Sequence, residues 1–355
     1  MAALLTSKGF KANLTDLPRF AENIKPFQEK GGIEVTGGEL YGFFEPNMIT
    51  TNIAEAVKGV EMVLVMSRAQ GHIPLIEGAL PHLEDGQIVV GYTPFWTMLR
   101  VLDKVRKRGL RNVVLGEVNI LPWSANRTGP STAYLRTTKR ELLAAALPAR
   151  DTGKLIEAMK EMPSPPKYVP AANVLETTLA DIMPELVVPI PLLNIGYLEN
   201  TKVSLYYEQG LTPPVARVVD ILDEERLAMG KALGLKLDTF AQLFIKWYSN
   251  YGVRGNSSFE IFNTLWTHKW EVPATSMKYE VEQGELAESL PYYFIPFIHL
   301  GHALGVPTPA HDTMINLAEL VTGKDYRREG VSLNNMGLDG MTAQQIIRYV
   351  NTGEK

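Results

Sequence analysis

Up to about residue 148, the chain alternates between short, continuous apolar runs and longer segments with helical spacing. The runs EMVLVMS, QIVVGY and NVVLGE are typical of parallel strands buried on both faces. We expect strands there and at KANLT, and helices over residues 18–30, 52–59, 70–83 and 95–108. This alternation predicts a parallel sheet covered by helices.

The Pro-rich stretch EMPSPPKYVP, residues 161–170, interrupts the alternation and is the best candidate linker. Beyond it strand patterns almost vanish, and four segments show apolar residues three and four apart, as in a helical bundle: residues 213–235, 240–252, 290–305 and 311–323. A length of 355 residues also suits two domains, since single cores rarely exceed about 250–300 residues. We therefore expect an α/β domain over residues 1–162 and a helical domain over residues 163–355.

Composition argues against several classes of protein. A net charge of −4 and a pI near 6.0 do not suit a nucleic-acid-binding surface. The absence of Cys excludes disulfides and thiol catalysis and fits a reducing compartment. No apolar run reaches the roughly 18 residues of a membrane span, so we expect no membrane contact and a cytoplasmic location. Of the six His residues, His299 and His302 stand one helical turn apart on an apolar segment, where packing is expected rather than a metal site.

Asp16 follows the strand-like KANLT and is the first candidate for cofactor binding. A carboxylate at the end of a second strand can accept hydrogen bonds from the adenosine ribose hydroxyls of NAD. Arg19 could instead meet the 2′-phosphate of NADP, which leaves both cofactors open. The alternative is an ordinary turn-forming Asp.

The segment VLVMSRAQGH places Ser67, Arg68 and His72 just past a predicted parallel strand. Ligands of parallel sheets sit beyond the carboxyl ends of the strands, so these side chains fall on the ligand side. Small Ala69 and Gly71 would let a helix N-terminus approach a phosphate or ribose. His72 could equally lie on the helix surface.

Three polar residues accompany the next strand end, in GEVNILPWSANR. Glu117 and Asn119 follow a buried strand, again on the ligand side. Arg127 comes soon afterwards and could hold a carboxylate in bidentate fashion. A loop salt bridge is the alternative. Further along, residues 173–194 begin the second domain and are expected to wall the cleft between the domains. Arg327 and Arg328 could reach an anionic ligand or hold the C-terminal segment in place.

In this order and spacing, the chain resembles the opine dehydrogenase family, also called octopine/nopaline dehydrogenases. The resemblance runs over essentially the whole length and rests on VLVMSRAQGH, LEDGQIVVGYTP, GEVNILPWSANRTGP, RELLAAALPA, NVLETTL, PLLN, LGHALGVPTP and DYRREGVSLNNMGLDGMTA, among other stretches. It implies a Rossmann-type domain followed by an all-α domain like the C-terminal domain of 6-phosphogluconate dehydrogenase. It also implies an NAD(P)-dependent oxidoreductase, with NAD slightly preferred, that reductively condenses a 2-oxo acid such as pyruvate with an amino acid.

The chain departs from the family pattern at its start. In the family, a strand and a glycine-rich G-x-G-x-x-G/A loop lead into a helix that reads much like MAALL. Met1 therefore resembles an internal methionine, and we expect the first strand and phosphate-binding loop to be missing through a misassigned start codon. Genuine loss of cofactor binding is the alternative.

A second departure concerns the catalytic pair. The resemblance places the family's His at Val187 or Val188, and its Asp at Gln283 or Ser289, so the dyad is missing. Lys278 could replace the Arg that anchors a substrate carboxylate, although without the fork geometry. Together with Glu117 and Asn119, Lys278 and Glu282 are the expected catalytic residues. Other candidates for the proton donor are Glu176, Asp181, Glu185, His72 and His268.

One alternative function and the oligomeric state stay open. A non-catalytic binding or regulatory relative would keep the fold after losing the active site. Small-molecule substrates are the expected partners, and the apolar segment FIPFIHLGHALG also makes a homodimer plausible.

Overall fold

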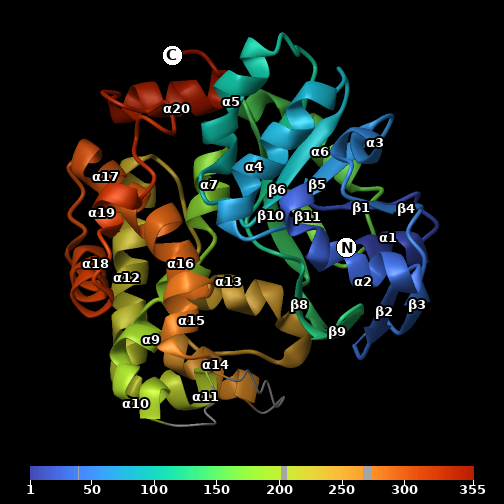
Figure 1. Cartoon of the computed structure of the whole chain (residues 1–355). Helices are drawn as coiled ribbons and strands as arrows, with labels where there is room; N and C mark the ends of the chain where they lie inside the picture. Colours follow the sequence, from blue (N-terminus) through green and yellow to red (C-terminus); the bar gives the residue numbers. More distant parts are fainter. Residues whose placement is uncertain (39, 201–205, 267–273) are drawn as a thin grey trace. The chain divides into compact units, whose positions relative to one another are not determined.

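The computed structural model describes residues 1–38, 40–200, 206–266 and 274–355, apart from the side chain of Trp266. The chain divides into two compact units, Met1–Val174 and Leu175–Lys355. Figure 1 shows the first in blue to green and the second in green to red. Each unit is described by itself. No described helix is long and apolar enough to cross a membrane.

A five-stranded sheet forms the centre of the first unit, in the order β11-β10-β7-β6-β5. Its parallel part comprises β5 (Met62–Val65), β6 (Ile88–Tyr92) and β7 (Val114–Val118), which confirms three predicted strands. β10 (Glu141–Leu147) runs antiparallel to β7, and β11 (Lys167–Pro170) pairs with β10 in parallel. The apolar runs of β6 and β7 are deeply buried, as at Val90 and Leu115, because helices cover the sheet. The run of β5 is not buried on both faces as expected: Met62, Val63 and Leu64 are partly exposed, because β5 lies at the end of the sheet.

The predicted helices beside this sheet form with nearly the expected bounds. They are α4 (Ala69–Ala79), extended by a 3-10 turn at Leu80–His82, and α5 (Thr97–Lys107). A third helix, α6 (Thr152–Met159), follows a 3-10 turn at Ala149–Asp151 and packs on β7 and β10. A Cβ on Gly116 of β7 would lie 2.7 Å from the Leu155 side chain, so glycine permits this close packing.

Two smaller sheets complete the first unit. β1 (Asn13–Thr15) pairs in parallel with β4 (Met48–Thr50), and the other sheet has the order β3 (Gly42–Phe44), β2 (Ile33–Thr36), β9 (Thr132–Thr138), β8 (Trp123–Gly129). The accompanying helices are α1 (Ala2–Ser7), a 3-10 turn at Pro18–Phe20, α2 (Ala21–Lys30) and α3 (Ile53–Val57). Gly31 ends α2 in the left-handed conformation, as the Gly31–Gly32 pair predicts.

The linker prediction for residues 161–170 needs a correction. Lys167–Pro170 is not a connecting segment but the edge strand β11, held by its pairing with β10. Contacts therefore divide the chain after Val174, twelve residues later than the boundary expected from the Pro-rich sequence. A proline can occupy a sheet edge, where its missing N–H costs no hydrogen bond.

The second unit is helical throughout its described residues, as expected. Its elements are α7 (Val174–Leu179), which begins at the unit boundary, α8 (Met183–Val187), α9 (Pro189–Leu193), α10 (Ile195–Asn200), α11 (Tyr206–Gly210), α12 (Pro213–Ala232), α13 (Phe240–Trp247), a 3-10 turn at Ser249–Tyr251, α14 (Ser258–Trp266), α15 (Met277–Glu282), α16 (Glu285–Ser289), a π-helical turn at Leu290–Phe294, α17 (Ile295–Leu304), α18 (Pro309–Thr322), α19 (Tyr326–Glu329) and α20 (Ala343–Thr352). Thr239 and Thr342 start α13 and α20 with capping boxes.

The apolar segment FIPFIHLGHALG lies mostly inside this unit. Phe294, Phe297, Ile298 and Leu300 are at most 1% exposed. The reason given above for a homodimer is therefore wrong, because these side chains form the unit's own core instead of an outer face.

A buried ion pair is formed by two residues of α12, Asp223 and Arg226. The Arg226 guanidinium is fully buried and bonds Asp223 Oδ1 at 2.6 Å and 2.9 Å, the Leu179 carbonyl at 2.8 Å and the Asp238 carbonyl at 2.6 Å. Asp223 Oδ2 accepts the Phe240 amide at the start of α13. The charge pair thereby ties α12 to the segments at both of its sides.

Candidate functional site

The carboxyl ends of three neighbouring parallel strands place Ser67, Thr93 and Asn119 at one level. The registers pair Val65 of β5 with Gly91 of β6, and Gly91 with Glu117 of β7. Ser67, Thr93 and Asn119 each stand two residues beyond these positions. Ligands of parallel sheets bind at this edge; the sequence analysis named Ser67 and Asn119 there, and the registers add Thr93.

The loop between β6 and α5 has an unusual backbone. Thr93, Phe95 and Trp96 have φ angles of 60°, 45° and 58°. These angles lie in the left-handed region, which residues other than glycine rarely adopt. Each such residue costs about 1–2 kcal/mol. The loop also carries Phe95 and Trp96 almost fully buried, while Thr93 stays partly exposed. Backbone strain of this kind persists only where the surrounding contacts impose it.

His72 is one of the residues that hold the start of α5. It is fully buried, with Nδ1 2.8 Å from Thr97 Oγ1 and Nε2 3.0 Å from the Ser67 carbonyl. Because a carbonyl can only accept, Nε2 carries the hydrogen and Nδ1 accepts from the Thr97 hydroxyl. Burial lowers the pKa of His72 to about 4, with a smaller contribution from Arg100 and an opposing one from the Ser67 hydrogen bond. His72 is therefore neutral at pH 7 and does not lie on the helix surface.

Glu117 and Asn119 are also buried, and both accept hydrogen bonds from backbone amides. Glu117 Oε1 accepts the Met98 amide at 2.7 Å, in the first turn of α5, where a carboxylate suits the helix dipole. Asn119 Oδ1 accepts the Leu143 amide at 2.9 Å and so joins the end of β7 to β10. Glu117 lies within β7 itself, one residue before the strand's last residue, and not after the strand as the sequence suggested.

Ser67 and Arg68 lie at the start of α4. The Ser67 hydroxyl donates to the Arg68 carbonyl at 3.0 Å, and Arg68 is exposed. A Cβ on Gly71 would come within 2.7 Å of Ser67 Oγ, so the glycine allows the helix to begin close to this hydroxyl. The expected approach of this helix start to a phosphate or ribose stays a prediction.

Asp16 and Arg19 belong to the smaller β1–β4 sheet. Asp16 follows β1 directly and accepts the Leu17 amide at 2.7 Å, with the Asn23 side chain 3.4 Å from its other oxygen. Lone pairs remain on both carboxylate oxygens for a ligand. The Arg19 guanidinium is exposed and lies 4.9 Å from the centre of the Phe20 ring.

Arg127 does not reach the other candidates. It lies on β8, and its guanidinium donates to the Gly129 and Pro130 carbonyls and lies 5.3 Å from the centre of the Phe27 ring. These contacts hold the turn between β8 and β9. The structure therefore gives Arg127 a local structural role.

In the helical unit, Lys278 and Glu282 line one surface cavity of about 360 Å³. Both lie on α15 and are exposed. Glu199 and Thr322 add polar groups to the wall, while Ile195, Met277, Val281 and Val321 make the rest apolar. The structure thus brings these two predicted residues together.

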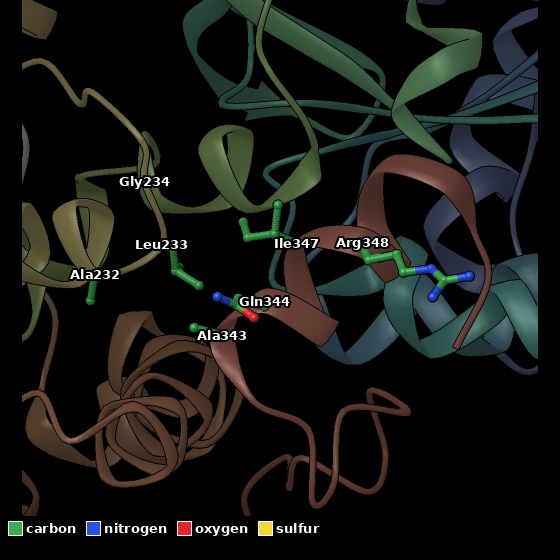
Figure 2. Close-up of a pocket in the computed structure, with 7 residues that line it drawn as sticks. All are labelled: Ala232, Leu233, Gly234, Ala343, Gln344, Ile347 and Arg348. Atoms are coloured by element: carbon green, nitrogen blue, oxygen red, sulfur yellow. The ribbon is translucent and has the colours of Figure 1, made fainter.

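A larger cavity of about 410 Å³ lies between the end of α12 and α20 (Figure 2). Its walls are formed by Ala232, Leu233, Gly234, Ala343, Gln344, Ile347 and Arg348. None of the predicted site residues lines it. Volume alone therefore does not identify the site.

Glu185 on α8 differs from the other acidic candidates. It is fully buried, and Oε1 accepts the Tyr293 hydroxyl at 2.7 Å from the π-helical turn. Within the described residues, Oε2 has no hydrogen-bond partner. Burial raises the pKa of Glu185 to about 8, although Arg226 and the Tyr293 hydrogen bond oppose this shift. Glu185 is therefore mostly protonated at pH 7.

The remaining candidates have structural contacts or lie elsewhere. Asp181 Oδ1 accepts the Met183 amide at the start of α8. Arg327 bonds Asp312 and Asn316 at 2.9 Å each, so it joins α19 to α18, and Arg328 is exposed beside Asp325. Glu176 is partly buried in α7. His268 lies outside the described residues.

The two positions of the family dyad hold no acid–base pair. Val187 and Val188 are buried, Gln283 is exposed at the end of α15, and Ser289 is buried at the end of α16. Within the described residues, no group of three or more His, Asp or Glu side chains is arranged to hold a metal ion.

Sequence reasoning missed the buried His311–Glu225 pair. His311 Nδ1 lies 2.7 Å from Glu225 Oε2, and that carboxylate also accepts the amides of Ala310 and His311 at the start of α18. The ring stacks on Phe297 at 4.1 Å. The motif PTPAH indicates a helix start after proline, and a helix start favours an acidic partner. The motif does not identify this partner as Glu225, which lies 86 residues away in the sequence.

Comparisons with known proteins agree with this architecture. The family described as NAD/NADP octopine/nopaline dehydrogenase, alpha-helical domain, matches residues 170–322. The opine dehydrogenase of Arthrobacter sp. (strain 1C) is 28% identical over 355 residues, which cover 97% of this chain and 93% of that protein.

Solved structures show the same fold. Octopine dehydrogenase with NADH and L-arginine has a TM-score of 0.75 at 18% identity, covering 100% of this chain and 95% of the other. Yersinopine dehydrogenase with NADP+ has a TM-score of 0.66 at 13% identity, covering 99% and 94%. The match to the family's helical domain, the relative aligned along nearly the whole chain and the shared fold lead to one conclusion: in sequence and in fold, the chain is similar to opine dehydrogenases.

Proposed function

We propose that this protein is an NAD(P)-dependent dehydrogenase that reductively condenses a 2-oxo acid with the amine of an amino acid. The observation that carries the proposal is the alignment with an opine dehydrogenase over 97% of the chain, across both units. Octopine dehydrogenase, with the same fold, binds NADH and L-arginine. The cofactor supplies a hydride for the imine carbon formed from the two substrates.

The first unit carries groups that fit a nicotinamide dinucleotide. The Asp16 carboxylate at the end of β1 would accept from the ribose hydroxyls, and Arg19 beside it would favour a 2′-phosphate. Ser67 and Arg68 would bind from the end of β5. We propose these four residues as cofactor contacts and His72 as a member of the same set that acts through Ser67 and Thr97; NAD is slightly preferred because Asp16 repels a phosphate. The expected strand and glycine-rich loop before Met1 stay a prediction.

Burial and hydrogen bonding limit which candidate residues can donate the proton. His72 is neutral at pH 7 and both of its nitrogens are engaged, so it cannot donate a proton. Glu185 combines a pKa near 8 with a bare Oε2, so it holds a proton that it can release. We propose Glu185 as the general acid that protonates the leaving oxygen as the C=N bond forms.

Lys278 and Glu282 are proposed for the substrate. The ammonium of Lys278, on the wall of the 360 Å³ cavity, would attract a substrate carboxylate, and Glu282 the substrate's ammonium group. Glu117 and Asn119, predicted as catalytic, bond the backbone at Met98 and Leu143. We propose that Glu117 and Asn119 are positioning residues, which hold the backbone around the site in place.

The test is calorimetric titration with NADH and with NADPH, followed by turnover with pyruvate and a mixture of amino acids. We expect binding of one cofactor and oxidation of that cofactor only when both substrates are present. Asp16→Ala should weaken NADH binding about tenfold, whereas the matched exposed variant Asp85→Ala should not. No binding of either cofactor to the wild type would refute the proposal.

A non-catalytic relative is the second candidate. The absence of an acid–base pair at Val187, Val188, Gln283 and Ser289 favours it. Cofactor binding without turnover, for any 2-oxo acid and amino acid supplied, would support this candidate. Location in the cytoplasm and assembly into a homodimer stay predictions; light scattering at micromolar concentration measures the second.

A further inference from the structure

The left-handed loop Thr93–Trp96 stands at the ligand edge of the sheet. It begins where β6 ends, and the Thr93 amide donates to the Val118 carbonyl of β7 at 3.1 Å. Thr93 is level with Ser67, and its side chain is the partly exposed one among the four residues of the loop. A ligand bound across the ends of β5 and β6 would therefore meet Thr93.

Thr93 is a poor residue for the backbone conformation it holds. Its φ of 60° is strained for a β-branched side chain, and Phe95 and Trp96 add strained angles beside it. Left alone, such a loop would relax toward negative φ angles. Contacts outside the loop must impose its shape.

Two buried side chains impose it, one from helix α4 and one from strand β7. His72 binds the Ser67 carbonyl beyond β5 and the Thr97 hydroxyl at the start of α5. Glu117, within β7, binds the Met98 amide. Their partners are the two residues that directly follow the loop, so the loop's far end is fixed to the strand on each side of β6.

We propose that His72 and Glu117 are positioning residues for the dinucleotide: they clamp the start of α5 and thereby hold Thr93 at the carboxyl end of β6 in contact with the cofactor. The inference rests on the proposed function. It gives both residues a role in cofactor affinity without direct contact, and it makes Thr93 the contacting residue.

The test is cofactor affinity, measured by fluorescence titration with whichever of NADH and NADPH binds the wild type. His72→Leu and Glu117→Leu each remove one side of the clamp and should raise Kd about tenfold. Thr97→Val removes the hydroxyl that His72 binds and keeps the side-chain shape, so it should raise Kd by a smaller factor. Lys107→Ala, at the exposed far end of the same helix, is the matched control.

A rescue separates positioning from a merely structural role. Glycine adopts positive φ without strain, so Thr93→Gly in the His72→Leu background should restore part of the affinity through the backbone. Circular dichroism shows which variants fold; if a Leu variant does not, Thr97→Val decides. Glu117→Gln is the conservative control: its amide oxygen can still accept the Met98 amide, so it should keep most of the affinity.

The outcomes are distinguishable. A wild type that binds neither cofactor overturns the proposed function and this inference with it. A wild type that binds, alongside folded Thr97→Val and clamp variants with Kd within about twofold of it, overturns the inference alone.

Discussion

His72 in the sheet unit and Glu185 in the helical unit are both fully buried ionisable groups, yet they are bonded differently. Both nitrogens of His72 have partners, and its ring is neutral at pH 7. Glu185 has one bonded oxygen and one bare oxygen, and it holds a proton at the same pH. Burial alone therefore does not distinguish a side chain that holds the structure together from one that can take part in proton transfer. The two side chains differ in how completely their polar atoms are hydrogen-bonded.

The largest expected effect is on the pH dependence of the helical unit. Glu185 has a pKa of about 8 when folded and 4.5 when unfolded, so the folded state holds the proton more tightly. Its contribution to the free energy of unfolding is complete below pH 4.5 and falls as the pH rises to 8, by up to about 5 kcal/mol. Glu185→Gln, which cannot ionise, should remove this decline.

Urea unfolding at pH 5 and pH 8.5, followed by circular dichroism, measures the difference. The gap between Glu185→Gln and the wild type should widen in favour of the variant at the higher pH. Glu282→Gln, an exposed acid in the same unit, is the control. A constant gap would show that Glu185 is ionised in the folded protein and would remove it as a proton donor.

His72 should produce the opposite slope. Its pKa is about 4 when folded and 6.5 when unfolded, so the unfolded state takes up the proton first. Its contribution is complete above pH 6.5 and is lost as the pH falls to 4, by about 3 kcal/mol. His72→Leu, where it folds, should flatten the acid side of the stability profile of the sheet unit. An unchanged acid limb would contradict the neutral, fully bonded state of His72.

The smallest expected effect comes from a variant in which one polar atom of His72 loses its hydrogen-bond partner, as in Glu185. Thr97→Val removes the hydroxyl donor and leaves Nδ1 of a buried imidazole without its partner. This should lower the free energy of unfolding by about 2 kcal/mol. Thermal unfolding of the variant at pH 7.5 checks it, and a loss below about 0.5 kcal/mol would mean that another group takes over the bond.

Much of the fold could be predicted from the sequence. Runs such as QIVVGY had to be buried parallel strands, and the apolar spacing of residues 213–235 had to be a helix, because periodicity reports which faces are covered. The strands β8, β9 and β10 were not anticipated. β8 and β9 carry mixed polar and apolar residues. β10 is mostly apolar, but its antiparallel pairing depends on a distant partner, with Val118 of β7 opposite Ala144.

The candidate site was predicted in part. Strand-end reasoning placed Ser67, His72, Glu117 and Asn119 near one edge of the sheet, because carboxyl ends of parallel strands meet there; the registers put Ser67 and Asn119 level at that edge. It could not show that three of them point into the protein, since direction depends on tertiary partners. The left-handed angles at Thr93 also carry no sequence signal, because glycine is the usual marker and it is absent from TPFWT.

The pairing of β5 has a practical consequence for handling the protein. Within the described residues, β5 lies at one end of its sheet and bonds to β6 on one side alone. Its sequence MVLV is apolar and uncharged, and an open strand edge of this kind can recruit strands from other molecules. Concentrated samples of the protein should therefore aggregate through intermolecular β-structure, whereas a low protein concentration, or short β-forming peptides that cover the edge of β5, should prevent this aggregation.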